Sequence, residues 1–475
     1  MEDVIVIGGG VVGCLTLRAL ASWKLRVRLI EKQYDLASGA TMANSAIVHA
    51  GYDPEPGTRK ARFNAEGNRL YPALARELDF LFLPTPSLVT AFGEEQEETL
   101  EKLLARGREN GVEGLSILRG EELFRAEPRL SEKVTAALRA PTAGITEPWS
   151  VAITAAENAA DNGALLNLGE EVTGLSRLPD GILVTTDKGE YKARAVVNAA
   201  GVWADRIHDM LLPHAFSIRP RLGQYYLLDR KVGDLVKNTL FACPTREGKG
   251  VLLSPSVHGK LLIGPDAREV SDRELTPTDA EGLRFVRESA ARFLREPLPM
   301  NLTIRTYAGI RPTPDTGDFI VGKTDVPGFY QAAGIESPGL ASAPAIAREL
   351  SETVARDLGA AKREDFNPFR RKQIRLNRMS EEEKRELISR DSRYAVIVCK
   401  CEKVSEAEIV DAIHRNAGAR SVKGVKKRVG AGFGRCQAGF CQPVVVSILA
   451  RELGIPKDQV LYDGPGSEIL KGKVK

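Results

Sequence analysis

The first 31 residues narrow the range of folds open to this chain more than any other segment. An apolar run, Val4–Ile7, leads into the glycine-rich turn Gly8–Gly13, and a helix-forming stretch follows to Leu20. A second apolar run, Val27–Ile30, ends at Glu31, 18 residues beyond the last glycine of the turn. This order, which is strand, glycine turn, helix, strand and acidic residue, predicts the first β-α-β unit of a Rossmann-like α/β fold.

This unit predicts a dinucleotide site. Gly8 allows the tight turn, Gly10 lets the backbone approach a pyrophosphate, and Gly13 lets helix and strand pack closely. The helix N-terminus offers free N–H groups and the positive end of its dipole to the phosphates. Glu31 stands where a carboxylate can accept hydrogen bonds from the adenosine ribose. A glycine-rich turn that holds no nucleotide is the alternative interpretation.

Three later segments rich in small residues predict the rest of a cofactor pocket. The loop Ala37–Gly51 is rich in hydroxyl groups and suits backbone that lies against a flat ring system. Ala195–Asp205 predicts a strand that enters a small-residue turn. Phe329–Leu340 predicts a strand, a glycine turn and a helix N-terminus, whose N–H groups suit the O2/N1 edge of a reduced flavin. The residues expected at the cofactor in these segments are Ser38, Thr41, Asn44, Ser45, Gly201, Gly334, Gly339 and Leu340.

Four of the six cysteines lie in the last quarter of the chain. Cys399 and Cys401 form a C-x-C pair, and Cys436 and Cys441 form a C-x-x-x-x-C pair after a 34-residue gap. Four thiolates from two loops can bind zinc or an iron–sulfur cluster. Structural zinc sites usually space paired cysteines by about two to four residues, so the one-residue spacing favours a [2Fe–2S] cluster. Zinc, or a site that has lost its metal, is the alternative.

The composition agrees with an intracellular enzyme that acts on small molecules. The 475 residues have room for about two or three domains, and a net charge of +4 gives no reason to expect nucleic acid as a partner. Cys14 and Cys243 lie far apart, which argues against a disulfide framework, and thiolate ligands suit a reducing compartment. Neither a signal peptide nor a membrane span is visible. We expect a cytoplasmic protein, with peripheral membrane association left open.

Together, the glycine turns and small-residue loops resemble the D-amino-acid oxidase (DAO) superfamily of FAD-dependent oxidoreductases over roughly residues 1–365. Within it, the chain is most similar to FAD-dependent glycerol-3-phosphate dehydrogenases and L-2-hydroxyglutarate dehydrogenases. The cysteine-rich segment resembles the small domain of bacterioferritin-associated ferredoxins, which the anaerobic type of glycerol-3-phosphate dehydrogenase also carries. Lys24 departs from the glycine of many FAD fingerprints, and the chain is shorter than the anaerobic subunit, so the cofactor is better specified than the substrate.

The resemblance implies an α/β fold in which a Rossmann-like FAD-binding domain is interleaved with an antiparallel-sheet substrate domain, followed by a small helical iron–sulfur domain. The FAD-binding domain is expected at about 1–75, 145–215 and 305–365, and the substrate domain at about 76–144 and 216–304. A linker at 366–394, a [2Fe–2S] domain at 395–460 and a tail at 461–475 complete the chain.

Residue patterns support this layout independently. The charged, periodic stretches 94–126 and 278–294 predict solvated helices, and the alternating stretches 218–230 and 250–265 predict strands. The charged, aromatic-poor segment between Arg356 and Arg393 predicts a linker or an arm that packs on the cluster domain.

The implied chemistry is oxidation of a carbon that bears a hydroxyl or an amine, with hydride transfer to flavin N5. Glycerol 3-phosphate is the first substrate candidate, followed by L-2-hydroxyglutarate and by amines or imino acids. The electrons would leave through the cluster to a quinone, an iron–sulfur protein or a partner subunit, so oxygen reactivity should be poor. A non-catalytic electron-transfer subunit is the alternative class.

Arg311 and His49 are the predicted catalytic residues. Arg311 follows a predicted strand and precedes a proline turn, so its planar fork would project from a rigid edge toward an anionic substrate. The family resemblance also places a substrate arginine here; the alternative is an ion pair with Asp315 or Asp318. His49 lies in the loop expected beside the flavin and suits proton transfer near neutral pH. Its alternative role is a hydrogen bond to backbone that only shapes the pocket.

Several other residues are weaker candidates. His258 lies in a predicted hairpin turn, and Tyr225 and Tyr307 could line the pocket or the core. Arg246 and Lys249 lie in a basic loop that could reach a phosphate but is more simply solvated. The remaining histidines carry no motif and are expected on the surface or in packing; they are His208, His214 and His414.

Overall fold

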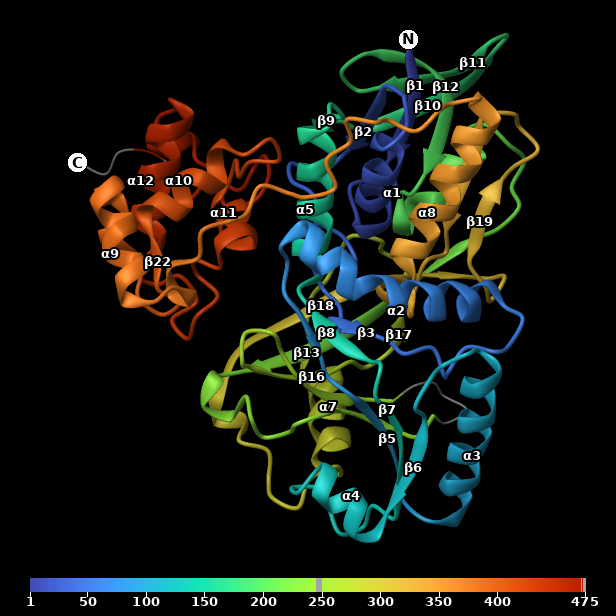
Figure 1. Cartoon of the computed structure of the whole chain (residues 1–475), viewed down its shortest axis with the longest axis vertical. Coiled ribbons are helices and arrows are strands. Elements are labelled where there is room, and N and C mark those ends of the chain that lie inside the picture. Colours follow the sequence, from blue (N-terminus) through green and yellow to red (C-terminus); the bar gives the residue numbers. More distant parts are fainter. Residues whose placement is uncertain (245–249, 471, 473–475) are drawn as a thin grey trace.

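A sheet assembled from distant segments forms the upper half of the molecule in Figure 1. The computed structural model describes residues 1–244, 250–470 and 472. Parallel strands lie in the order β9-β2-β1-β12-β20, as the Rossmann-like unit predicts. Their bounds are Leu165–Leu168 (β9), Val27–Glu31 (β2), Glu2–Ile7 (β1), Glu190–Asn198 (β12) and Phe329–Ala333 (β20). The central strands are apolar and buried, as strands covered on both faces must be.

Antiparallel strands extend this sheet. β10 (Val172–Leu178) and β11 (Gly181–Thr186) form a hairpin that continues onto the first half of β12. β20 pairs with the second half of β12 on the same edge, and β19 (Ile320–Lys323) pairs with the other edge of β20.

Closely packed helices cover the sheet and fix the ends that reach the site. α1 (Val11–Ala21) packs against both α5 (Pro148–Asp161) and α8 (Gly339–Leu358), and α2 (Arg59–Leu78) packs across α8. A Cβ on Gly67 of α2 would lie 2.0 Å from the carbonyl oxygen of Ala341, so only glycine permits this approach of the two backbones. The contact holds the first turn of α8 in place.

A nine-stranded sheet, mostly antiparallel, forms the lower half of the molecule. Its order is β17-β13-β16-β15-β14-β5-β7-β6. β16 and β17 pair with different parts of one edge of β13, and β18 pairs along the other edge. The bounds are Arg268–Glu269 (β17), Ile218–Leu228 (β13), Leu261–Gly264 (β16), Leu252–Pro255 (β15), Thr239–Ala242 (β14), Ser87–Ala91 (β5), Ala136–Ala140 (β7), Ser116–Arg119 (β6) and Thr303–Pro314 (β18). The helices α3 (Glu94–Glu109), α4 (Gly120–Ala126) and α7 (Ala280–Ala291) cover this sheet.

Two expectations for this region are wrong in detail. β18 was expected in the nucleotide-binding domain from residue 305, but it pairs with β13 along its whole length and so belongs to the lower sheet. The stretch 94–126 is not all helix, because its segment Ser116–Arg119 pairs with β7 as a strand.

A small three-stranded sheet lies between the two large ones. β8 (Gly144–Thr146) pairs with β3 (Ile47–Val48) on one side and with β4 (Phe82–Pro84) on the other. It anchors the end of the loop Ala37–Gly51 between the two domains.

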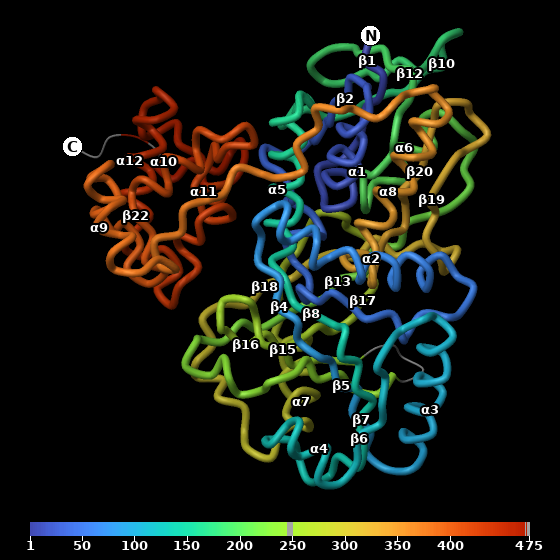
Figure 2. Tube along the Cα trace, in the orientation of Figure 1, coloured from blue at the N-terminus to red at the C-terminus, as the bar shows by residue number. Residues whose placement is uncertain are grey.

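The cysteine-rich segment folds as a separate helical domain, orange to red in Figures 1 and 2. Its elements are α9 (Glu381–Arg390), β21 (Ile397–Cys399), β22 (Val404–Ser405), α10 (Glu406–His414), α11 (Val422–Val429) and α12 (Gln442–Leu453). α10 begins with a capping box between Ser405 and Glu408. Ile409, Val425 and Leu449 are fully buried in the core between the three helices that follow β22.

The segments on either side of this domain are more ordered than a linker and a tail. The chain from α8 runs as an extended arm along the nucleotide-binding domain (Figure 2), where Asn162 and Glu77 accept from the backbone N–H groups of Asn367 and Arg370. The predicted linker also contains α9. In the predicted tail, Leu461 pairs with Glu468, and the carbonyl of Leu461 accepts from the first N–H of α11.

None of the helices in the described part of the chain is long and apolar enough to cross a bilayer.

Candidate functional site

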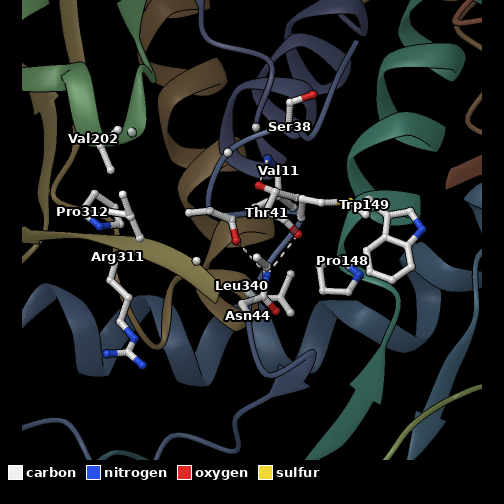
Figure 3. Close-up of a pocket in the computed structure, with 18 of the residues that line it drawn as sticks. Val11, Ser38, Thr41, Asn44, Pro148, Trp149, Val202, Arg311, Pro312 and Leu340 are labelled. Atoms are coloured by element: carbon white, nitrogen blue, oxygen red, sulfur yellow. Dashed lines mark hydrogen bonds between the residues drawn. The ribbon is translucent and has the colours of Figure 1, made fainter. Parts of the chain in front are cut away.

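A cavity of about 770 Å³ lies between the two large sheets, at the carboxyl ends of the parallel strands. In an open parallel sheet, this edge is where nucleotide ligands bind. Figure 3 shows Trp149 and Arg311 on opposite sides of the cavity, with Thr41, Asn44 and Leu340 between them. Most of the residues predicted at a cofactor therefore line one space.

The glycine turn forms one wall of this cavity. A Cβ on Gly13 would lie 1.9 Å from the carbonyl oxygen of Gly8, and one on Gly8 would lie 2.4 Å from that of Ala199. Gly8 also has a φ of +109°, which favours glycine. Gly8 and Gly10 line the cavity, whereas Gly13 packs behind them and sets the spacing between helix and strand.

Glu31 lies at the end of β2 on the same wall. Its carboxylate accepts from the N–H of Gly9 at 2.5 Å and from that of Gln33 at 2.8 Å. Burial raises the pKa of Glu31, although these two backbone N–H groups oppose the effect. The side chain is thus fixed beside the glycine turn, with the position that a ribose-binding acid needs.

Residues of the loop Ala37–Gly51 form the floor of the cavity. Thr41 Oγ1 accepts from the N–H of Val11 at 3.0 Å, which joins the loop to the first turn of α1. Ser38 donates to the carbonyl of Asp35 at 2.7 Å, and Asn44 donates to the carbonyls of Ala40 and Thr41. The Thr41 bond holds the loop against the glycine turn, and the other bonds fix the shape of the loop itself.

The first turn of α8 closes another side. Gly339 and Leu340 line the cavity, and Gly201 lines it from the turn after β12. Gly334 does not line the cavity; its φ of +66° and the nearby ring of Pro314 make it a turn residue that orients the approach to α8. The free N–H groups at the start of α8 therefore face a space that the glycine turn also reaches.

β18 supplies the wall on the side of the lower sheet. Gly309 lies close to the floor loop, since a Cβ there would be 2.1 Å from the carbonyl oxygen of Ala43. The rings of Tyr225 and Tyr307 stack with centroids 4.8 Å apart. Tyr307 donates to the carbonyl of Asn44 at 3.1 Å, and the Tyr225 hydroxyl lies 3.3 Å from that of Ser45. The two tyrosines thus belong to the cavity wall.

Arg311 also lines the cavity from β18, on the same strand face as Tyr307. Its guanidinium crosses Gly223 of the neighbouring strand, where any Cβ would lie 2.4 Å from Arg311 Nη2. Nη2 donates to the carbonyl of Asp266 at 3.1 Å. The alternative partner Asp318 instead accepts from the N–H groups of Arg59 and Lys60, so its carboxylate is used elsewhere.

His49 lines the same cavity. Its Nε2 lies 3.5 Å from the hydroxyl of Ser337, just before α8, and its ring lies 5.6 Å from that of Phe241. The backbone carbonyl of His49 accepts from Asn64 and Asn68 of α2, which fixes the loop at this point. The imidazole is therefore held on a rigid segment between α2 and α8.

The other histidines have identifiable partners. His258 lines the cavity from the turn between β15 and β16 and lies 2.8 Å from the carboxylate of Glu147. His208 is buried and lies 2.7 Å from Gln331, whereas His214 and His414 pair with Asp209 and Glu452 at the surface. The predicted basic loop with Arg246 and Lys249 lies outside the described residues.

The C-terminal domain completes the cavity, which the sequence did not indicate. Lys423 and Lys426 of α11, Phe433 and Tyr462 all line it. The ring of Phe433 stacks on that of Trp149, at the start of α5, with centroids 5.3 Å apart and planes inclined by 23°. The only local signal was the i, i+3 spacing of Lys423 and Lys426, which places both on one helix face.

The four predicted metal ligands lie together at the edge of this contact. The sulfurs of Cys401 and Cys436 are 3.7 Å apart. The Cys441 thiol donates to Cys399 and, with the N–H groups of Gly432 and Glu402, lowers the pKa of Cys399 to about 6. Cys401 is exposed, and Cys399 and Cys441 are buried. Within the described residues, no set of three or more His, Cys, Asp or Glu side chains is already arranged to hold one metal ion.

The residues fit the two predicted cofactors. For FAD, the fit rests on the glycine cradle, the acid at the end of β2 and a cavity that continues to the start of α8. For a [2Fe–2S] cluster, it rests on the donor set, which is four thiols from two loops.

Two protein-family models match the chain. The FAD dependent oxidoreductase (DAO) family matches residues 3–353, and the BFD-like [2Fe–2S] binding domain matches residues 397–451. The predictions of FAD, of a [2Fe–2S] cluster and of the fold class are therefore confirmed.

Individual proteins agree with these models. A glycerol 3-phosphate dehydrogenase of Caloramator mitchellensis is 47% identical over 479 residues, which cover 100% of this chain and 99% of that protein. An L-2-hydroxyglutarate dehydrogenase of Indibacter alkaliphilus is 30% identical over 57% of this chain and 69% of its own length. The structure of dithionite-reduced L-α-glycerophosphate oxidase from Mycoplasma pneumoniae with FAD bound is similar with a TM-score of 0.73 and 31% identity, covering 78% of this chain and 98% of that one. The chain therefore belongs to the DAO family of FAD-dependent oxidoreductases and carries a BFD-like [2Fe–2S] binding domain at its C-terminal end.

Proposed function

We propose that this enzyme oxidises glycerol 3-phosphate to dihydroxyacetone phosphate and passes the electrons out through its [2Fe–2S] cluster. The observation that carries the proposal is the 47% identity to a glycerol 3-phosphate dehydrogenase over the whole chain, cluster domain included. The similarity to an L-2-hydroxyglutarate dehydrogenase covers 57% of the chain, so this substrate ranks second.

Oxidation of the substrate removes a hydride from the carbon and a proton from its hydroxyl, leaving a carbonyl group. FAD, when bound, supplies the acceptor for the hydride. We assign the proton to His49 Nε2, which faces the cavity near the start of α8. Asn64 and Asn68 hold the backbone carbonyl of His49, so the imidazole projects from a fixed point of the loop.

Arg311 is assigned to the anionic end of the substrate. Its guanidinium donates to the carbonyl of Asp266 and lies in the cavity wall beside Pro312. A planar fork binds phosphate or carboxylate in a bidentate manner, so the same residue serves glycerol 3-phosphate or a 2-hydroxy acid.

The electrons leave to an external acceptor at the exposed side of the cluster site. Cys401 is exposed, and the side chain of Phe440, beside Cys441, is 85% exposed. We propose a quinone or an iron–sulfur protein at this surface, including a partner subunit of that kind. Sedimentation with quinone-loaded vesicles tests membrane association. Co-sedimentation of the enzyme with the vesicles supports a quinone as the acceptor. Turnover with a ferredoxin in the vesicle-free supernatant supports a protein acceptor.

Steady-state turnover of the purified holoenzyme with an artificial acceptor tests the substrate. Glycerol 3-phosphate, L-2-hydroxyglutarate and a set of amino and imino acids are compared, with dihydroxyacetone phosphate measured as product. We expect the highest kcat/KM for glycerol 3-phosphate and little peroxide in air, since the cluster gives the electrons another exit. Preference for L-2-hydroxyglutarate would contradict the substrate, and near-stoichiometric peroxide would contradict the electron route.

A further inference from the structure

Two buried lysines lie on one aromatic ring between the cavity and the cysteines. Lys426 Nζ is 4.6 Å from the ring centroid of Phe433, and Lys260 Nζ is 5.9 Å from the same centroid. Phe433 precedes the ligand Cys436 by three residues, and its ring stacks on Trp149 in the cavity wall. The two ammonium groups therefore lie at the junction of the flavin cavity and the cluster site.

Lys426 is close to the cluster loop as well as to the cavity. A Cβ on Gly432 would lie 3.8 Å from Cδ of Lys426, and the N–H of Gly432 donates to the thiol of Cys399. The lysine side chain thus packs against the backbone segment whose N–H binds the ligand Cys399.

The junction carries more positive than negative charge. Lys426 is 6% exposed, and no ion pair joins it to a carboxylate in the part of the chain that the structure describes. Lys260 shares the buried carboxylate of Glu402 with Arg230. Arg305, which also lines the cavity, contacts the neutral amide of Gln437 at 3.3 Å.

An ammonium group buried without a carboxylate destabilises the fold unless another charge compensates it. Burial, together with the nearby charges of Arg305 and Lys260, lowers the pKa of Lys426 to about 7, in the same direction. Docking of the domain does not depend on it, because Lys427 and Arg428 on the same helix already pair with Asp35. A negatively charged group that is held next to Phe433 would remove the penalty.

We propose that Lys426, supported by Lys260, raises the reduction potential of the cluster held by Cys399, Cys401, Cys436 and Cys441. Reduction adds one negative charge to a centre that already carries four thiolates, and a buried cation stabilises the reduced form over the oxidised form. The cluster then takes electrons more readily from the flavin side of the Trp149–Phe433 contact. Lys426 is a positioning residue here, since it acts through the cluster and not on the substrate.

The inference rests on the cluster assignment and on the proposed electron route, but not on the identity of the substrate. Its test is a potentiometric titration of the full-length holoenzyme with dithionite and mediators, in which electron paramagnetic resonance follows the reduced cluster. No substrate is added, so a failure of glycerol 3-phosphate as substrate leaves the result unaffected. A wild-type protein without any iron–sulfur couple would overturn the inference and the proposed route together.

Three variants give the decisive comparison. At the wild-type midpoint, Lys426→Met should lower the ratio of reduced to oxidised cluster about tenfold, which is a downward shift of about 59 mV for a one-electron couple. Lys426→Arg keeps the positive charge, so the midpoint potential of its cluster should stay close to that of the wild type. Lys400→Met is the matched control: Lys400 lies between Cys399 and Cys401 in the sequence but is exposed, so solvent screens it and the shift should be several-fold smaller.

Cluster and FAD content, measured as iron and flavin per chain, show whether each variant is intact. If Lys426→Met fails to hold a cluster, Lys260→Met takes its place, and we expect a smaller downward shift because Lys260 already shares Glu402. An unchanged cluster potential in an intact Lys426→Met would overturn the inference. So would equal shifts in Lys426→Met and Lys400→Met, or a shift of the flavin couple alone, which would assign Lys426 to the flavin.

Discussion

Lys427 of the C-terminal domain lies 2.9 Å from the carboxylate of Asp35, in the loop that precedes the cavity floor. Arg428 pairs with the same carboxylate at 2.8 Å, and Lys427 also donates to the carbonyl of Leu36 at 2.6 Å. All three side chains are at most 5% exposed. The cluster domain is thus docked on the segment that leads to Ser38, and its position and the shape of the FAD cavity depend on one another.

Asp35→Asn should destabilise the protein by about 3–5 kcal/mol, because it leaves two buried cations without their counter-charge. Thermal unfolding followed by circular dichroism and by flavin release measures the effect. Glu386→Gln, which removes one partner of an exposed i, i+4 pair with Arg390, is the control and should change the melting temperature little. Equal melting temperatures for wild type and Asp35→Asn would contradict the docking role.

The same ion pairs predict a pH dependence. Burial opposes ionisation of Asp35, but Arg428 and Lys427 outweigh it and hold the pKa of this carboxyl well below its usual range. A lowered folded-state pKa contributes stability that is present above the unfolded value of about 3.9 and is lost as the pH falls through the folded value. The stability difference between wild type and Asp35→Asn should therefore be largest near neutral pH and shrink in acid. A difference that grows on acidification would be the wrong sign.

Arg311→Ala should raise the KM for glycerol 3-phosphate by about 30- to 1,000-fold, since loss of one partner of a buried charged hydrogen bond costs about 2–4 kcal/mol. Arg311→Lys keeps the charge but lacks the planar guanidinium, so its KM should lie between those of the wild type and of Arg311→Ala. Arg219→Ala, an exposed arginine on the neighbouring strand β13, is the control. An unchanged KM in Arg311→Ala would remove this residue from the substrate site.

His49→Asn should lower kcat by about 10²- to 10⁴-fold with FAD content preserved, because the substrate hydroxyl loses its proton acceptor. His258→Asn provides the comparison, as His258 lines the same cavity but is paired with Glu147. Pre-steady-state flavin reduction separates the chemical step from later electron transfer. A larger loss in His258→Asn than in His49→Asn would reverse the assignment.

Gly13→Ala should yield protein with little FAD and a lower melting temperature, because its Cβ cannot fit 1.9 Å from the carbonyl oxygen of Gly8. Gly39→Ala is the control: Gly39 lines the cavity directly, but nothing lies within 4 Å of the position of its Cβ. Flavin absorbance per chain after purification gives the result directly. Equal flavin content in both variants would show that the glycine turn does not form the dinucleotide site.

The features that the sequence revealed are those whose chemistry is local. The turn from Gly8 to Gly13 needs glycines at fixed spacing, because neighbouring backbone atoms leave no room for a side chain. The cysteines are similar, since a cluster requires thiolates and their spacing reflects two short loops. Strands β1, β2, β12, β13 and β20 were visible as apolar or alternating runs for the same reason.

The contacts between domains could not be predicted. Trp149 and Phe433 are nearly 300 residues apart in the sequence, and neither stands in a motif. Lys260 and Lys426 resemble ordinary solvated lysines until the docked domain buries them. The assignment of β18 to the lower sheet likewise depends on pairing with β13, and a single strand pattern does not name its partner.

The most direct test of the central claim is a stopped-flow record of the visible spectrum when anaerobic, oxidised holoenzyme is mixed with sn-glycerol 3-phosphate. We predict rapid loss of the flavin band, followed by bleaching of the sulfur-to-iron absorption as the electrons reach the cluster. A flavin band that stays oxidised would contradict glycerol 3-phosphate as the substrate. A reduced flavin with an unchanged cluster spectrum would contradict the internal electron route.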